Sequence, residues 1–154
     1  GAVRFHATEL RDNPHICYCR MCQKAHGGLF ADGVGVRHEH LTWTRGKPSE
    51  FLSSDHAARG FCSNCGTSLY YRTIGGPHVS LTIGSFDQPH LIPILLEMGL
   101  EGMHPSLAHV PGAKQLGTTD EVDGADAVAA IAGSNHQHPD QDTETWTPRE
   151  ASHE

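Results

Sequence analysis

The chain has 154 residues, of which 6% are aromatic, and this length suits one domain with a modest core followed by a tail. The net charge of −7 lies at one end: residues 1–111 hold nine Lys and Arg against nine Asp and Glu, whereas residues 112–154 hold two against nine. This balance argues against nucleic acid as the main partner, which would call for a basic face. Because no apolar run approaches the ~18 residues of a membrane span and no secretory signal is visible, we expect a cytoplasmic protein that binds no membrane.

Short strands dominate the structure expected for residues 1–111. The alternation of Val3 and Phe5 indicates a first strand, and a turn follows at residues 11–14. Apolar, β-branched and aromatic residues predict further strands at residues 29–31, 34–36, 39–43, 50–52, 58–61, 68–72, 79–83 and 92–96. Pro93 places the last of these at an edge or an end, and irregular structure is expected after it, over residues 98–109. The pattern therefore predicts a mainly β fold.

The composition changes in residues 112–154, which we treat as an acidic tail outside the β domain of residues 1–111. Residues 123–133 are rich in helix formers and end at a glycine, so they predict one short helix. The polar residues that follow show no core pattern, and we expect them to lack stable structure of their own.

Three thiols lie within six residues, at Cys17, Cys19 and Cys22. In an extended segment Cys17 and Cys19 point the same way, and the chain must then turn for Cys22 to reach the same metal. Residues 23–26 are expected to continue as a short helical turn. Three protein ligands leave the fourth tetrahedral position of a zinc ion open, which is the usual arrangement of catalytic zinc. We therefore predict that these cysteines are both the metal ligands and the catalytic residues.

Four basic side chains flank the cysteines and are candidates to hold an anionic substrate. They are Arg20, Lys24, His26 and Arg59. A lone basic side chain beside a turn is, however, more often simply solvated at the surface. Positive charge close to the thiols would in any case favour their thiolate form, which is the form that binds metal.

Cys62 and Cys65 form a second predicted metal-binding pair, a zinc knuckle by its spacing, followed by Gly66 where a tight turn needs a residue that tolerates positive φ. Two thiolates cannot close a tetrahedral structural site alone. One possibility is that the pair borrows two thiols from the first cluster, which would make a closed structural site and leave one thiol over. The other is that its partners lie elsewhere.

Several motifs occur together in residues 1–111. They are Gly1-Ala2-Val3-Arg4-Phe5, Cys17-x-Cys19-x-x-Cys22-x-Lys24-x-x-Gly27, Trp43-x-x-Gly46 with Ser53-Ser54, and Gly60-Phe61-Cys62-x-x-Cys65-Gly66-Thr67. In combination they resemble the glutathione-dependent formaldehyde-activating family, which also includes centromere protein V. The resemblance implies several coiled antiparallel β-sheets with zinc knuckles, similar to a small zinc-binding accessory protein of Rab GTPases.

The resemblance also implies two zinc sites. The catalytic zinc is carried by Cys17, Cys19 and Cys22, and Cys62 and Cys65 supply half the ligands of a structural zinc. In the family the other half comes from a Cys-x-Cys directly before the segment that matches residues 1–4, so we expect this second site to be incomplete in the present chain. Where the family often has His between its first two cluster cysteines, this chain has a tyrosine.

The activity that the resemblance implies is the reversible joining of a thiol, typically glutathione, to an aldehyde such as formaldehyde, as in a carbon–sulfur lyase of the S-hydroxymethylglutathione synthase type. An open zinc position can bind the thiol as a thiolate or polarise the aldehyde oxygen. Three thiolate ligands weaken the zinc as a Lewis acid, which favours the thiol-binding role. A non-catalytic, zinc-stabilised binding module and a thiol redox sensor remain open as alternatives.

Overall fold

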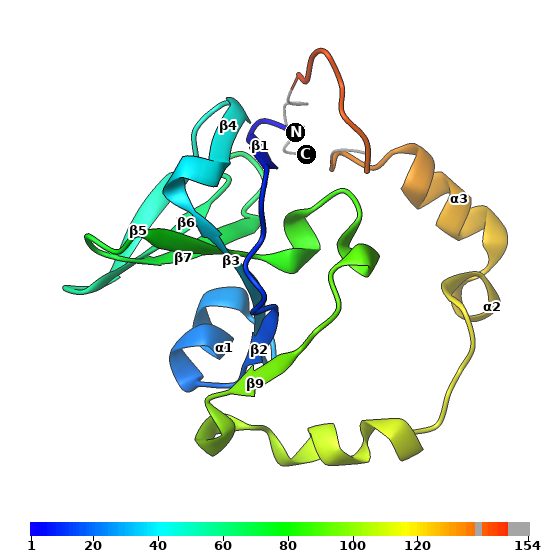
Figure 1. Ribbon diagram of the computed structural model, residues 1–154. Coiled ribbons are helices and arrows are strands. Elements are labelled where there is room, and N and C mark those ends of the chain that lie inside the picture. The colour runs from blue at the N-terminus through cyan, green and yellow to red at the C-terminus, as the bar shows by residue number, and fades with distance from the viewer. Residues whose placement is uncertain (138–139, 148–154) are drawn as a thin grey trace.

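A computed structural model describes residues 1–137 and 140–147 of the protein, so the end of the predicted acidic tail, residues 148–154, lies outside the described residues (Figure 1). The strands are β1 (Arg4–Ala7), β2 (His15–Cys17), β3 (Ala31–Arg37), β4 (Leu41–Arg45), β5 (Ser49–Ser54), β6 (Ala57–Phe61), β7 (Ser68–Thr73), β8 (His78–Leu81) and β9 (Leu96–Met98). The α-helices are α1 (Arg20–His26), α2 (Thr119–Asp123) and α3 (Ala125–Gly133), and 3₁₀ turns occupy His38–His40, Ile83–Ser85, Pro89–Leu91, Leu100–Gly102 and Pro105–Gly112. The predicted mainly β class is confirmed.

The described strands form two sheets. The larger has the order β5-β6-β7-β8-β3-β2-β9, and the smaller pairs β1 with β4. Neighbouring strands are antiparallel, as the family resemblance implied, except that β2 and β9 run parallel. This parallel pair brings the segment after residue 95 next to the first cysteine cluster, with Cys17 opposite Met98.

The core lies where β3 and β8 meet in the middle of the large sheet. Val34, Val36 and Leu81 are its largest fully buried side chains, and Val34 lies opposite Leu81 in the ladder. The small sheet packs on the same cluster through Phe5 and Trp43, whose rings meet edge to face at 5.8 Å. The valine and leucine pattern of β3 and β8 thus supplies the rigid centre from which β2 and its cysteine extend.

Two strand predictions are corrected by the structure. Residues 29–31 and 34–36 were expected as separate strands, but β3 is continuous through Gly33, where a side chain would collide with the Ser80 hydroxyl and the His15 ring. The strand expected at residues 92–96 begins only at Leu96, because the N–H groups of Leu95 and Leu96 both donate to the Pro14 carbonyl and start the pairing with β2 there.

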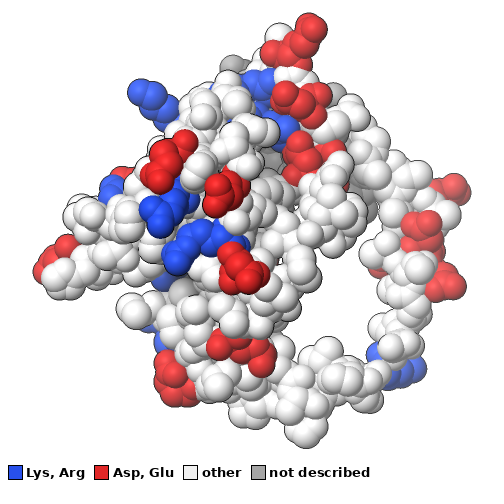
Figure 2. All heavy atoms as spheres, in the orientation of Figure 1, with Lys and Arg blue, Asp and Glu red and all other residues white. Residues whose placement is uncertain are grey.

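The acidic tail forms an open arc rather than one helix. Figure 1 shows the chain running from β9 through α2 and α3 and returning toward the N-terminus, where Asp142 lies 3.5 Å from the Arg4 guanidinium. Thr118 and Glu121 form a capping box that starts α2, and Gly124 separates it from α3, so residues 119–133 make two helices where one was predicted over residues 123–133. Figure 2 shows Asp and Glu gathered along this arc. No helix within the described residues has the length and apolar character of a membrane span.

Glu50 on β5 is linked to β7 across the intervening strand β6. Its carboxylate accepts hydrogen bonds from Arg72 at 2.5 and 2.8 Å and from the Tyr70 hydroxyl at 2.7 Å. The bonds from Arg72, with Tyr70, lower the pKa of Glu50 to about 2 from an ordinary value of 4.5. Because the folded pKa is depressed, the stabilisation is present above about pH 4.5 and is lost as the pH falls toward about 2.

Glu50→Gln is therefore expected to lower the free energy of unfolding by about 1 kcal/mol at pH 7, a value limited by the partial exposure of the pair. The difference from the wild type should shrink as the pH falls below about 4.5 and vanish near pH 2. Urea unfolding of metal-free protein at several pH values measures it, with Asp55→Asn, an exposed carboxylate in the turn after β5, as the control. A destabilisation that stays constant down to pH 2 would contradict the assigned role.

Candidate metal centre

The first cysteine cluster spans the junction between β2 and α1. Cys17 ends β2, Tyr18 turns into the core with 6% of its surface exposed, and Cys19 stands as the N-cap of α1 in an extended conformation. Cys22 lies in the first turn of the helix. The Sγ atoms of the three cysteines all lie within 4.8 Å of one another. The predicted alternation followed by a turn therefore brings all three thiols to one point.

Residues 97–102 contact this junction between β2 and α1 and hold it in place. The Tyr18 N–H donates to the Met98 carbonyl at 2.9 Å, and the Tyr18 hydroxyl donates to the Glu97 carboxylate. The Gln23 amide on α1 donates to the Gly102 carbonyl at 2.8 Å. The tyrosine between the two cysteines thus points away from the thiols and fastens the loop to β9.

The thiols differ in how readily they ionise in the metal-free protein. Burial, together with hydrogen bonds involving the neighbouring thiols, raises the pKa of Cys17 to about 12. Burial opposes ionisation of Cys19 as well, but hydrogen bonds from the backbone N–H of Cys22 and Met21 and from the neighbouring thiols outweigh it, so the pKa of Cys19 lies below its ordinary value. The start of α1 therefore provides the first thiolate for a metal, whereas Cys17 releases its proton only when metal binds.

The geometry and the donor set of the cluster fit a zinc ion. Sulfur atoms around one tetrahedral Zn²⁺ lie ~3.8 Å apart, given Zn–S bonds of ~2.3 Å. The observed separations, all within 4.8 Å, approach this value, and thiolates are ligands that zinc accepts readily. Among the described residues, these three cysteines are the group of three or more possible ligands whose ligand atoms all lie within 4.8 Å of one another. Cys62 and Cys65 are not part of this group. A closed site built from both clusters is thus not the arrangement that the fold adopts.

The three thiols open into a cavity of about 370 Å³ between α1 and the large sheet, where β2, β3, β6, β7 and β8 line it. Its polar and charged lining comprises Asn13, His15, His26, Asp32, Arg59, Tyr71, Arg72, Thr73, His78, Ser80 and Thr82. Arg59 lies on its wall, and its single carboxylate, Asp32, accepts the Ile83 N–H at 2.9 Å through Oδ1. The cavity therefore combines a soft metal site at one end with walls suited to an anion.

The amino-acid sequence is similar to that of a known protein family. A family model described as glutathione-dependent formaldehyde-activating enzyme matches residues 1–97. The chain belongs to this family. A solved structure that it resembles is a crystal structure of a Rhodobacter sphaeroides protein from structural genomics, 19% identical, covering 64% of this chain and 93% of that chain with a TM-score of 0.47. No curated protein matches.

Membership in the formaldehyde-activating family confirms the resemblance that the motifs indicated, and the matched residues 1–97 include both cysteine clusters. The family points to an activity related to glutathione and formaldehyde.

The second cysteine pair lies in another cavity, of about 190 Å³, together with the amino group of Gly1. The Gly66 N–H donates to the Cys62 carbonyl at 2.8 Å, and Gly66 takes φ 77°, which is the knuckle turn predicted from its spacing. Cys65 Sγ lies 3.1 Å from the Thr67 hydroxyl, and this contact helps to lower the pKa of Cys65 against the effect of burial. A structural zinc on Cys62 and Cys65 stays a prediction.

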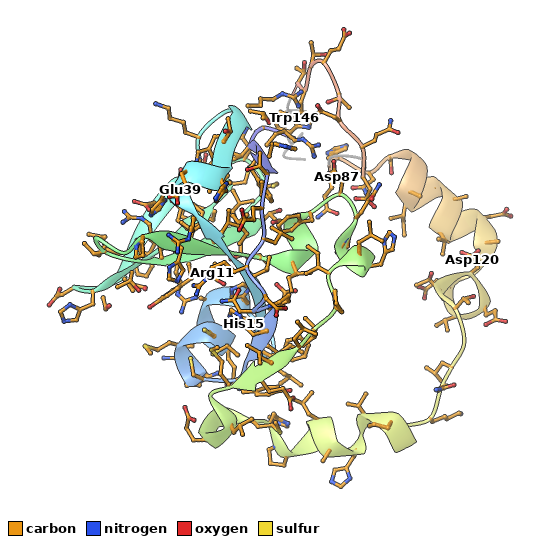
Figure 3. All side chains as sticks on the ribbon, in the orientation of Figure 1. Arg11, His15, Glu39, Asp87, Asp120 and Trp146 are labelled. Carbon is orange, nitrogen blue, oxygen red and sulfur yellow. The ribbon has the colours of Figure 1, made fainter. Side chains whose placement is uncertain are left out.

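The four basic residues predicted to flank the site separate in the structure. His26 and Arg59 line the cavity, whereas Arg20 donates to the half-buried Gln23 side chain and Lys24 faces a different hollow. Sequence reasoning missed His15, at the start of β2 (Figure 3), as well as Asp32, Tyr71 and His78. His15 alone carried a signal, because it lies two residues before Cys17 and must share its strand face.

Proposed function

We propose that the protein reversibly joins an anionic thiol of the glutathione type to a small aldehyde of the formaldehyde type, as a zinc-dependent carbon–sulfur lyase. The observation that supports this most directly is the convergence of Cys17, Cys19 and Cys22 at the end of a cavity whose wall carries Arg59. Membership in the formaldehyde-activating family supplies the chemical class.

The three cysteines hold the metal, and the cavity walls bind and orient the substrates. Zinc, when bound, lowers the pKa of a thiol that reaches it and so supplies a thiolate at neutral pH, where a free thiol with a pKa near ~8.5 is mostly protonated. Arg59 provides positive charge for a carboxylate of the incoming thiol.

His26 is suited to take the proton that the thiol loses. Its ring lines the cavity, and burial followed by the positive charge of Arg59 lowers its pKa, so it is neutral at pH 7 and has a free nitrogen lone pair. Its Nε2 lies 3.5 Å from the Ser68 hydroxyl, which holds the ring at the cavity wall.

The decisive experiment measures exchange between formaldehyde and its glutathione adduct by two-dimensional NMR, with zinc-loaded protein and with a protein-free blank. We expect the protein to raise the exchange rate well above the spontaneous one, and metal removal by a chelator to return it to the blank. A rate equal to the blank for zinc-loaded protein would reject the enzymatic proposal and favour a zinc-stabilised binding module.

Redox sensing is a second candidate, because thiols within 4.8 Å of one another, one with a lowered pKa, are also arranged for disulfide formation. Hydrogen peroxide would then release zinc and form a disulfide within the cluster at peroxide concentrations that leave ordinary thiols reduced. Slow oxidation, at the rate of free glutathione, would reject this function.

A further inference from the structure

Arg59 connects the large sheet to the cysteine cluster. It lies on β6, 37 residues from Cys22 along the chain, yet its Nη2 donates a hydrogen bond to the Cys22 sulfur at 3.5 Å. Its guanidinium carbon also lies 5.1 Å from the centroid of the Tyr71 ring. Because Arg59 and Tyr71 are paired residues on β6 and β7, the ring that supports the guanidinium belongs to the neighbouring strand.

The other arginines close to the site make different contacts. Arg72 is held by Glu50 through hydrogen bonds of 2.5 and 2.8 Å. Arg20 is exposed and contacts Gln23 at 3.3 Å. Arg59 is therefore the cation whose position is set by both a thiol and an aromatic ring, and its charge lies where the metal ligands meet the cavity.

A guanidinium in this position has two physical consequences. Three thiolates around one divalent zinc leave a net negative charge, which repels an anion that enters the cavity unless a cation lies beside it. An N–H donor on a ligand sulfur also fixes the orientation of that ligand, and losing such an outer partner typically costs 10–100-fold in metal affinity. Stacking on an aromatic ring keeps the guanidinium in place and leaves several of its N–H groups for other acceptors.

We propose that Arg59 is a positioning residue that orients Cys22 for the metal and offsets the charge of the thiolate cluster, so that the cavity admits an anionic thiol next to it. The thiol-binding half of this inference rests on the proposed function, whereas the metal-affinity half does not.

The test compares Arg59→Met with the wild type and with Arg20→Met, the matched loss of an exposed arginine that contacts no thiol of the cluster. Competition with a chromophoric chelator measures zinc affinity. Cobalt(II)-substituted protein reports the binding of glutathione through the sulfur-to-cobalt charge-transfer band. Circular dichroism and thermal unfolding show whether each variant is folded.

We expect Arg59→Met to bind zinc at least about 10-fold more weakly than the wild type and to lose a further factor of about 10 in glutathione affinity, with Arg20→Met unchanged. Arg59→Lys keeps the charge without the planar fork, so it should recover glutathione affinity more than zinc affinity. This divided rescue is a signature that a merely structural role would not produce.

Wild-type affinities for both zinc and glutathione in Arg59→Met would overturn the inference. If Arg59→Met does not fold, Arg59→Lys is compared directly with the wild type. Zinc and glutathione affinities that are retained to an equal extent in Arg59→Lys would then overturn the inference. The proposed function fails separately: weakened zinc binding in Arg59→Met, together with no acceleration of adduct exchange by the wild type, would keep the metal-positioning role and reject the thiol chemistry.

Discussion

Cys19→Ser is expected to remove the metal from the cluster and to reduce the acceleration of glutathione–formaldehyde exchange by at least about 100-fold, more than the loss of an outer partner of a metal ligand usually costs. Hydrogen bonds at the start of α1 lower the pKa of Cys19, so its loss takes away a thiol that is predisposed to the thiolate form that binds metal. Serine is a favoured N-cap residue, and the substitution should therefore leave α1 in place. Metal analysis by mass spectrometry, the exchange assay and circular dichroism together check this result.

Cys65→Ser is the matched control, because it removes a thiol from the other cluster by the same change of one atom. We expect it to lower stability while leaving most of the exchange activity, since Cys65 lies in a separate cavity from the three metal-ligating thiols. If Cys19→Ser unfolds the protein instead, the first cluster is structural and the catalytic proposal is wrong. Retention of both the metal and the activity in Cys19→Ser would also contradict the catalytic proposal.

Gly99→Ala is expected to weaken zinc binding by about 10-fold or more, although residue 99 holds no ligand. Gly99 has φ 67°, and a Cβ there would lie 2.6 Å from the Cys19 backbone nitrogen and 3.0 Å from the Cys19 Cβ. The methyl group must push Cys19 away from its partners, because the contact is with backbone rather than with a flexible side chain. Competition with a chelator measures the affinity, and the left-handed conformation itself should cost roughly 1–2 kcal/mol of stability.

Gly75→Ala separates these two effects. Gly75 has φ 72° and no atom within 4 Å of the position that a Cβ would take, so it carries the same conformational cost without the collision. We expect a larger loss in the free energy of unfolding for Gly99→Ala, which adds the collision to the conformational cost, and a loss of zinc affinity for Gly99→Ala alone. Equal zinc affinities in the two variants would show that the turn at residues 99–102 does not control the position of Cys19.

The structure also shows why some predictions from sequence succeeded. Strand alternation and one helical turn are local properties, and they account for the proximity of Cys17, Cys19 and Cys22. Contacts from Glu97, Met98 and Gly102, which are distant in the sequence, then hold this junction in place. The helical turn expected at residues 23–26 is part of α1, which begins at Arg20. Most strands of residues 1–81 were likewise recognisable from their β-branched and aromatic content.

The proximity of the three thiols, the mainly β class and the family were thus determined by sequence alone, because each rests on local patterns along the chain. The cavity, the contact of Arg59 with Cys22, the parallel pairing of β2 with β9 and the division of the tail into α2 and α3 were decided only by the tertiary structure. The cavity, the Arg59–Cys22 contact and the β2–β9 pairing each join residues that are at least 37 positions apart or that lie in several strands. Strand order and register control which of these residues meet, and local sequence patterns do not determine either. The tail divides because Gly124, in a left-handed conformation, interrupts the helix at a point that helix-forming composition did not reveal.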